Sequence, residues 1–232
     1  MFSDAFLAVT GSELKKMQPN RVAYMACRFS PSGVGLVNLP EELPPGSIIL
    51  LDDSMQIDRH SPEIVTKQLC GLVEQFSPAG VLLDFQQPVT REAFDMAAAI
   101  CKALPCPVAV TEDYARKLAC AVFLSACPAN AALEKYLEPW KQEVYLEIAP
   151  GRMQIAITED GASTFYLPAG ETKSLGFYDE ELCCHYKTEI FDNRVVFTLQ
   201  RSREDLKKLM TQAQKLGVTA MVGLYQELIS MV

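Results

Sequence analysis

Short apolar runs rich in β-branched residues alternate along the chain with longer amphipathic stretches. This alternation is typical of parallel strands joined by crossover helices, so it predicts an α/β fold. The candidate strands number eight, which is the number in a (β/α) barrel. They cover residues 22–27, 35–38, 48–51, 81–85, 108–111, 121–124, 144–148 and 220–224.

Three of the amphipathic stretches predict helices that pack on the outside of the strands. Ser61 is a capping residue followed by Pro62, and apolar residues then recur on one face through residue 76. The stretch 94–104 and a helix that opens at Ser202 show the same periodicity. The segment 30–47 is dense in proline and glycine, so we expect the helix layer to be incomplete in the first part of the chain.

A different pattern follows residue 148, where alternating strands are joined by the turn pairs Asp160-Gly161 and Asp192-Asn193. We therefore predict one domain over residues 1–232 that carries a small antiparallel insertion at 149–200, before the last helix and strand. The insertion is rich in apolar side chains, which indicates a protein-interaction module as one possible function. These residues are Phe165, Tyr166, Leu167, Phe177 and Tyr178.

The net charge and the lengths of the apolar runs exclude two classes of partner, nucleic acids and membranes. A formal charge of −8 repels a phosphate backbone, so we expect no nucleic-acid partner. The N-terminal segment has no basic region ahead of its short apolar stretch, and no run approaches the roughly 20 apolar residues that cross a bilayer. We expect a cytoplasmic protein with no membrane partner, and the pattern does not specify its oligomeric state.

Eight cysteines lie mostly in apolar segments of a chain that is large enough to fold without disulfides, so we expect free thiols. His60 and His185 are the only histidines, and the cysteines lack partners at zinc-site spacing. We therefore expect no metal and no cofactor.

One strand carries a motif. The segment Ala79-Gly-Val-Leu-Leu-Asp-Phe-Gln-Gln-Pro88 resembles the signature strand of glycoside hydrolase family 18, which reads D-G-x-D-x-D-x-E, then an aromatic residue and often a proline. Gly80, Asp84 and Pro88 match the pattern. Ala79 and Leu82 stand in place of its first two aspartates, and Gln86 stands in place of its catalytic glutamate. Phe85 takes the place of the usual aromatic residue.

The later part of the chain is similar to the same family in the order of its elements. Residues 142–152 resemble the stretch that precedes the family's insertion, and an insertion, a last helix and a last strand follow. The resemblance covers roughly residues 45–228 and implies a TIM-like (β/α) barrel. It also implies a chitinase-like fold whose catalytic motif is degenerate, because residues 123–127 lack the tyrosine and aspartate that hold the substrate in this family. Tyr225 is the nearest candidate for the family's aromatic floor.

The absence of the family's catalytic glutamate determines which activity we expect. In this family the glutamate protonates the glycosidic oxygen, whereas a glutamine at position 86 can donate a hydrogen bond but cannot deliver a proton. The resemblance therefore implies a barrel that binds a carbohydrate or glycan fragment without efficient hydrolysis. The expected ligand-binding residues are Asp52, Asp53, Asp84, Gln86, Tyr145 and Tyr225.

A second hypothesis keeps an enzyme. The functional face of a (β/α) barrel is the C-terminal end of its strands, and carboxylates follow several predicted strands. Asp84, Glu112 and Glu147 are the candidates for a glycoside hydrolase of altered mechanism that uses an acid and base pair. A structural interpretation competes with both hypotheses, because such carboxylates also cap turns, favour the first turns of helices and bind backbone amides.

Overall fold

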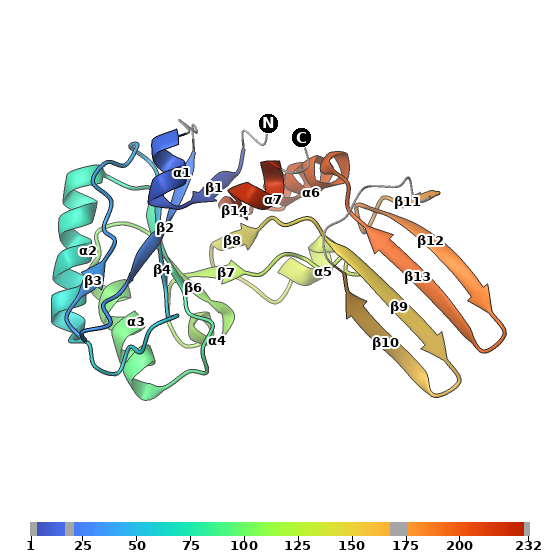
Figure 1. The fold of residues 1–232 in the computed structure, drawn as a ribbon, viewed down its shortest axis with the longest axis horizontal. Helices are drawn as coiled ribbons and strands as arrows, with labels where there is room; N and C mark the ends of the chain where they lie inside the picture. Colours follow the sequence, from blue (N-terminus) through green and yellow to red (C-terminus); the bar gives the residue numbers. More distant parts are fainter. Residues whose placement is uncertain (1–3, 17–20, 168–175, 230–232) are drawn as a thin grey trace.

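Eight parallel strands close into a barrel in the computed structural model, which describes residues 4–16, 21–167 and 176–229 (Figure 1). The barrel strands are β1 (Phe6–Val9), β2 (Val22–Phe29), β4 (Ile48–Asp52), β5 (Gly80–Asp84), β6 (Val108–Thr111), β7 (Ala121–Leu124), β8 (Val144–Glu147) and β14 (Ala220–Leu224). The ring closes because β1 pairs in parallel with both β2 and β14. The predicted TIM-like barrel is confirmed.

One predicted barrel strand is wrong and one strand was missed. The segment 35–38 contains β3 (Leu36–Val37), which pairs antiparallel with the end of β2 and lies outside the ring. The eighth barrel strand is β1, a run of four apolar residues near the N-terminus. It is as short and nearly as buried as β7, which was predicted from its apolar run, so neither its length nor its burial accounts for the omission.

The three predicted helices are confirmed as α2 (Pro62–Phe76), α3 (Arg91–Ala103) and α6 (Arg203–Lys215). Ser202 begins α6 with a capping box to Asp205, whereas Ser61 occupies the cap position of α2 without a side-chain hydrogen bond. Four short helices complete the order: α1 (Gly11–Lys16), α4 (Glu112–Ala115), α5 (Leu133–Leu137) and α7 (Tyr225–Ile229). Within the described ranges, no helix has the length and apolar character needed to cross a membrane.

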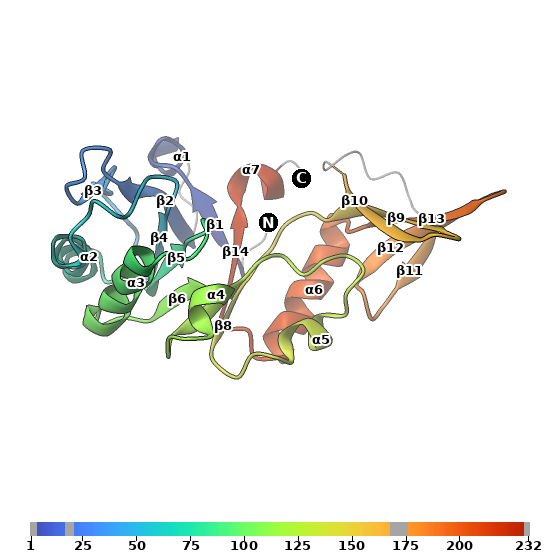
Figure 2. The same cartoon turned by 90° about the horizontal axis from the view of Figure 1, so that it is seen from below.

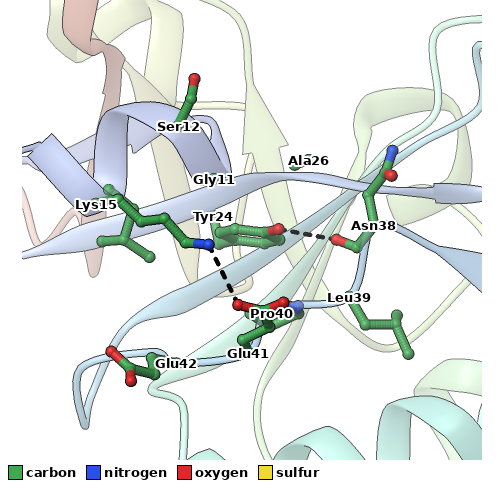
Figure 3. Close-up of a pocket in the computed structure, with 11 residues that line it drawn as sticks. Gly11, Ser12, Lys15, Tyr24, Ala26, Asn38, Leu39, Pro40, Glu41 and Glu42 are labelled. Carbon is green, nitrogen blue, oxygen red and sulfur yellow. Dashed lines mark hydrogen bonds and ion pairs between the residues drawn. The ribbon is translucent and has the colours of Figure 1, made fainter.

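The helix layer is incomplete between β2 and β4, as the proline-rich and glycine-rich segment predicts. A groove of about 660 Å³ lies there, between α1 and the segment that follows β3 (Figure 3). The Tyr24 hydroxyl donates a hydrogen bond of 2.8 Å to the carbonyl of Asn38, and Lys15 forms an exposed ion pair with Glu41 at 3.2 Å. Loop residues therefore cover the outer face of β2 where a helix would otherwise pack.

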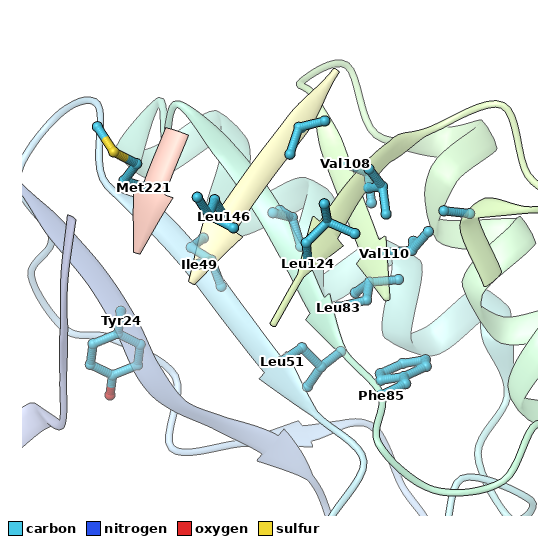
Figure 4. Close-up of a cluster of buried hydrophobic side chains, with 14 of the residues drawn as sticks. Tyr24, Ile49, Leu51, Leu83, Phe85, Val108, Val110, Leu124, Leu146 and Met221 are labelled. Carbon is cyan, nitrogen blue, oxygen red and sulfur yellow. The ribbon is translucent and has the colours of Figure 1, made fainter. Parts of the chain in front are cut away.

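Two apolar clusters follow from the alternation of side chains along the strands. Outward-facing residues such as Ile49, Leu83 and Leu146 pack between the sheet and the helices (Figure 4). Inward-facing residues fill the interior of the barrel, so the barrel is a packed core rather than a channel. The interior cluster consists of Phe6, Ala8, Ala23, Ile48, Leu50, Leu82, Ala109, Ala121, Phe123, Tyr145, Ala220 and Val222. All eight cysteines are free.

A separate antiparallel sheet precedes the last helix and strand, as predicted, and extends away from the barrel (Figures 1 and 2). Its strands, in spatial order, are β10 (Gly161–Tyr166), β9 (Arg152–Thr158), β13 (Arg194–Gln200), β12 (Cys184–Phe191) and β11 (Phe177–Asp179). Asp192-Asn193 forms the predicted turn. The other turn is shifted by one residue to Glu159-Asp160, because Gly161 pairs with Thr158.

Arg201 joins this sheet to the barrel. Its buried guanidinium donates hydrogen bonds to the carbonyls of Cys127, Pro128 and Leu182, the last two at 3.0 Å. These carbonyls belong to the loop after β7 and to the segment before β12. One side chain thus holds the base of the second sheet against the C-terminal end of the barrel.

The close approach of β14 to β8 generates a stability prediction. A Cβ atom at Gly223 would lie 2.5 Å from the Ile148 carbonyl oxygen and 2.7 Å from the Leu228 side chain, whereas one at Gly71 in α2 would meet nothing within 4 Å. We expect Gly223→Ala to lower the free energy of unfolding by about 1 to 3 kcal/mol. Gly71→Ala should raise it by up to about 1 kcal/mol. Denaturant unfolding of both variants checks this, and equal effects would contradict the packing described.

Candidate ligand-binding site at the barrel mouth

Polar side chains replace the apolar interior at the C-terminal ends of the strands. Each barrel strand alternates inward and outward positions, so the next inward positions after the interior cluster are Asp52, Asp84, Thr111 and Glu147. Asp52 and Asp84 are direct partners in the β4–β5 ladder. Two carboxylates therefore stand on adjacent strands at the same level of the barrel mouth.

Asp84 and Gln86 form the central pair of the mouth. They are two residues apart, and the Gln86 amide Nε2 donates a hydrogen bond of 2.5 Å to Asp84 Oδ1. Asp84 is half-buried at the end of β5, while Gln86 is exposed just beyond it. The amide is therefore held by the carboxylate and still has its carbonyl oxygen and second N–H available to a ligand.

Asp53 has a structural position. It is buried, with 6% of its surface exposed, and its two carboxylate oxygens accept hydrogen bonds from the backbone N–H groups of Gln86 and Gln87 at 2.9 and 2.8 Å. Asp52 accepts a bond from the backbone of Ser54 at 2.9 Å. The structural interpretation of these two acids thus has direct support, and Asp53 fixes the loop that presents Gln86.

The acidic mouth perturbs its own carboxyl groups. Burial raises the pKa of Asp84, and the charges of Asp52 and Asp53 raise it further against the opposing hydrogen bond from Gln86. Burial also raises the pKa of Glu147, and Asp84 adds to that increase. Glu147 accepts a backbone hydrogen bond from Ala126 at 3.1 Å, which acts in the opposite direction. The carboxylates of β5 and β8 are therefore close enough to influence each other.

Tyr136 of α5 lies beside two of the other candidate acids. Its hydroxyl donates a hydrogen bond of 3.0 Å to the carbonyl of Ser125. Burial raises the pKa of Tyr136, with contributions from the charges of Glu112, Cys127 and Glu147. Glu112 is half-buried at the start of α4. Residues of α4 and α5 thus border the mouth on this side, where the ring of Tyr136 lies near Glu112 and Glu147.

Two tyrosines expected at the site lie elsewhere. Tyr145 is 3% exposed inside the barrel, and its hydroxyl lies beside Gly80 at the start of β5, at the opposite end from the mouth. Tyr225 packs against the outer cluster, between the sheet and the helices, while its neighbour Leu224 packs on the interior. Neither tyrosine therefore contributes its ring to the group around Asp84 and Gln86.

Arg28 and Tyr136 belong to the mouth and were missed in the sequence. Arg28 pairs with Asp52 at 3.5 Å because β2 continues beyond residue 27 and its register shifts between Tyr24 and Cys27. A prediction that assumes regular alternation, without this register shift, places the last residues of β2 on the wrong face of the sheet. Tyr136 lies on a helix of five residues, which is too short to show a periodic signal.

A hollow of about 570 Å³ adjoins the mouth. It lies between the loops after β4 and β5, and its lining includes Asp53 and Gln87, whose backbone N–H donates a hydrogen bond to Asp53. Met55, Ile57 and Pro88 give it apolar surface, and Asp58 and Glu92 give it acidic surface. The part of the chain that the structure describes contains no group of three or more histidine, cysteine or acidic side chains placed to hold a metal ion.

Solved structures with a similar architecture are known, although comparisons of the sequence find no relative. No family model and no curated protein sequence matches the chain. Among solved structures, it is similar to the C-terminal domain of a putative chitinase from Desulfitobacterium hafniense, at 10% identity and a TM-score of 0.53, over 95% of this chain and 92% of that one. The fold is chitinase-like.

Two further structures extend the likeness. The spore cortex-lytic enzyme SleL from Bacillus megaterium is 9% identical with a TM-score of 0.53, over 98% of this chain and 72% of that one. A plant class V chitinase mutant from Cycas revoluta, solved in complex with (GlcNAc)3, is 11% identical with a TM-score of 0.51, over 98% and 96% of the two chains. At these identities the likeness establishes the fold of the chitinase-like barrel.

The raised pKa of Asp84 predicts a pH-dependent stability. The folded protein retains this proton at pH values where the unfolded chain has released it, so stability falls as the pH rises through the folded-state pKa. Asp84→Asn removes that loss. We expect the variant to be more stable than the original protein at pH 7, with a difference that shrinks below about pH 4, where an unfolded aspartate is protonated.

Thermal unfolding at both pH values measures the effect. Asp95→Asn is the matched control, because Asp95 is an exposed residue of α3 whose ion pair with Arg91 contributes under about 1 kcal/mol. A stability difference for Asp84→Asn that is the same at both pH values would contradict the desolvation of this carboxyl.

Proposed function

We propose that the mouth of this chitinase-like barrel binds a carbohydrate or glycan fragment without efficient hydrolysis. The observation that carries the proposal is the hydrogen-bonded pair of Asp84 and Gln86 at the end of β5. It presents an amide and a carboxylate side by side at the face where barrel enzymes bind their ligands.

The chemistry of the pair favours binding over catalysis. A glutamine has no ionisable proton, and general acid catalysis is typically worth about 10² to 10⁴ in rate. An amide and a carboxylate together offer both donors and acceptors, which suits the hydroxyl and acetamido groups of a sugar. Asp53 fixes the backbone of Gln86, so the amide is oriented before a ligand arrives.

The fold supports the same class of ligand. Among the structures that share this fold, the Cycas revoluta chitinase mutant was solved with (GlcNAc)3. Transferring that ligand class to this chain is part of our proposal. The motif also lacks two aspartates at Ala79 and Leu82, so we propose that restoring glutamate at position 86 does not restore hydrolysis.

Calorimetric titration with chitooligosaccharides and peptidoglycan fragments tests the binding. We expect measurable affinity that falls about 5- to 10-fold in Gln86→Ala, because one direct hydrogen bond contributes roughly 1 kcal/mol and 1.4 kcal/mol is tenfold. Gln75→Ala, an exposed glutamine of α2 away from the mouth, should bind like the original protein. Absence of binding to every glycan, or equal affinities for the two variants, would refute the proposal.

A second candidate is a glycoside hydrolase of altered mechanism that uses Asp84 with Glu147. Its support is that both carboxyls have a raised pKa and that Asp84 contributes to the increase at Glu147. Two interacting acids of this kind can divide into a proton donor and a base. Glu112, on the α4 side of the mouth, is the alternative partner for Asp84.

Turnover of a panel of aryl glycosides distinguishes the two candidates. If the mouth is catalytic, Asp84→Asn and Glu147→Gln should each lower the rate by about 10²-fold or more, as loss of an acid or base does. Asp95→Asn should leave it unchanged. We expect no turnover above the buffer rate, and a signal that Asp84→Asn removes would replace the binding proposal with the enzyme.

A further inference from the structure

Among the residues that the structure describes, no strand pairs with the outer edge of β10. Strand β10 is the outer strand of the second sheet, and all six of its residues are exposed, including Phe165 at 54% and Tyr166 at 76%. Edge strands in native proteins usually carry charges, prolines or bulges that prevent pairing with another chain. The sequence of β10, Gly-Ala-Ser-Thr-Phe-Tyr, contains no charged residue and no proline. Its register with β9 is regular from Gly161 to Tyr166, so it has no bulge.

The other free edges of the described strands are protected. The opposite edge of the same sheet begins with β11, which has three residues, ends at Asp179 and is followed by Glu180 and Glu181. Beyond β11 the edge continues along residues 187–191 of β12, where Lys187 and Glu189 carry charges. Outside the barrel, β3 has only two residues. Shortness and charged side chains therefore distinguish these edges from β10.

The backbone phase of β10 is known from its pairing. The N–H of Leu167 donates to the carbonyl of Arg152 at 2.9 Å, and alternate residues of an antiparallel strand direct their hydrogen-bonding groups toward the same neighbour. Gly161, Ser163 and Phe165 therefore face β9. The N–H and carbonyl groups of Ala162, Thr164 and Tyr166 face away from the sheet.

We propose that β10 pairs antiparallel with β10 of a second copy of this chain, on a two-fold axis through Thr164. Thr164 then faces Thr164 of the other copy, and Ala162 faces Tyr166. Every one of these residues has its backbone groups directed outward, so the pairing forms six hydrogen bonds. It joins two five-stranded sheets into one of ten strands.

The side chains fit this register. Residues that are opposite each other share a face of the sheet, so Tyr166 lies over Ala162 of the second copy and Phe165 lies over Ser163. Each large ring is thus matched with a small residue, and a register moved by two residues would lose this match. The face that carries Tyr166 also carries the half-buried Ile155 and Phe197 and the exposed Ile157, so an apolar surface would continue across the joint.

Charge does not oppose the pairing, although the chain is acidic overall. Of the described residues next to β10 in the sequence, the acidic ones are Glu159 and Asp160, at the turn beyond its start. In the two-fold arrangement the two turns lie at opposite ends of the joint, roughly 27 Å apart at 3.4 Å per residue. That separation exceeds the screening length of about 8 Å at physiological salt.

Sedimentation velocity across a range of micromolar concentrations tests the dimer. We expect the mass to rise with concentration toward twice the 25.7 kDa of one chain. Thr164→Lys places two like charges against each other on the axis and should weaken association at least tenfold. Thr164→Pro removes two of the six hydrogen bonds and should have the same effect.

Thr188→Lys is the matched control, because Thr188 is an exposed threonine of the same sheet that lies on β12, three strands away from β10. It should dimerise like the original protein, and the thermal midpoints of all variants verify that each is folded. A chain that stays monomeric at every concentration would overturn the proposal. A dimer that Thr164→Lys does not weaken would overturn it as well, because another surface would then hold the two copies together. Neither result bears on glycan binding at the mouth.

Discussion

The pairing of β1 with both β2 and β14 is the contact on which the rest of the structure depends. Without it the parallel strands would form an open sheet, and the ends of β4, β5 and β8 would lie along an edge. Closure makes inward-facing side chains converge on one interior. A run of four residues thus brings Asp52, Asp84 and Glu147 to a single mouth.

Within that mouth, similar acids have different surroundings. Asp53 faces outward from the barrel, and both of its oxygens accept backbone hydrogen bonds, so its charge stabilises a loop. Asp84 faces inward, beside other acids, and burial raises its pKa. Strand alternation accounts for this difference. Asp52 is the ladder partner of Asp84, and Asp53, one residue further along, lies on the other face. The loop that Asp53 holds also places Gln86 at the mouth.

Much of the architecture could be predicted from the sequence. The long helices can be recognised by the periodicity of their apolar residues, seven of the barrel strands by their short apolar runs, and the two hairpins by their turn residues. The strand β1 was missed, although its run of four apolar residues is similar in length and burial to that of β7, which was predicted. Of the site, the Asp84 and Gln86 pair was readable from the motif on β5. Arg28 was not, since it depends on an irregularity in β2, and Tyr145 was misplaced, because which end of the barrel a ring reaches depends on its side-chain direction.

The barrel mouth and the second sheet expose different chemical groups. The mouth offers oriented polar groups of the kind that hold a sugar, while the far sheet offers an uncharged strand edge and apolar rings. Arg201 fixes the sheet against the barrel through three backbone carbonyls. A dimer through β10 would therefore present two mouths at a fixed relative orientation, which favours binding to a polymer with repeated units.

The central claim is that the ligand enters the mouth beside Asp84 and Gln86. A titration of the isotopically labelled protein with chitooligosaccharide, followed by amide chemical shifts, tests it most directly. The account predicts that the shifted amides cluster at residues 84–87 and around Glu147, at the ends of β5 and β8. Shifts confined to the second sheet, or no shifts at saturating sugar, would contradict it.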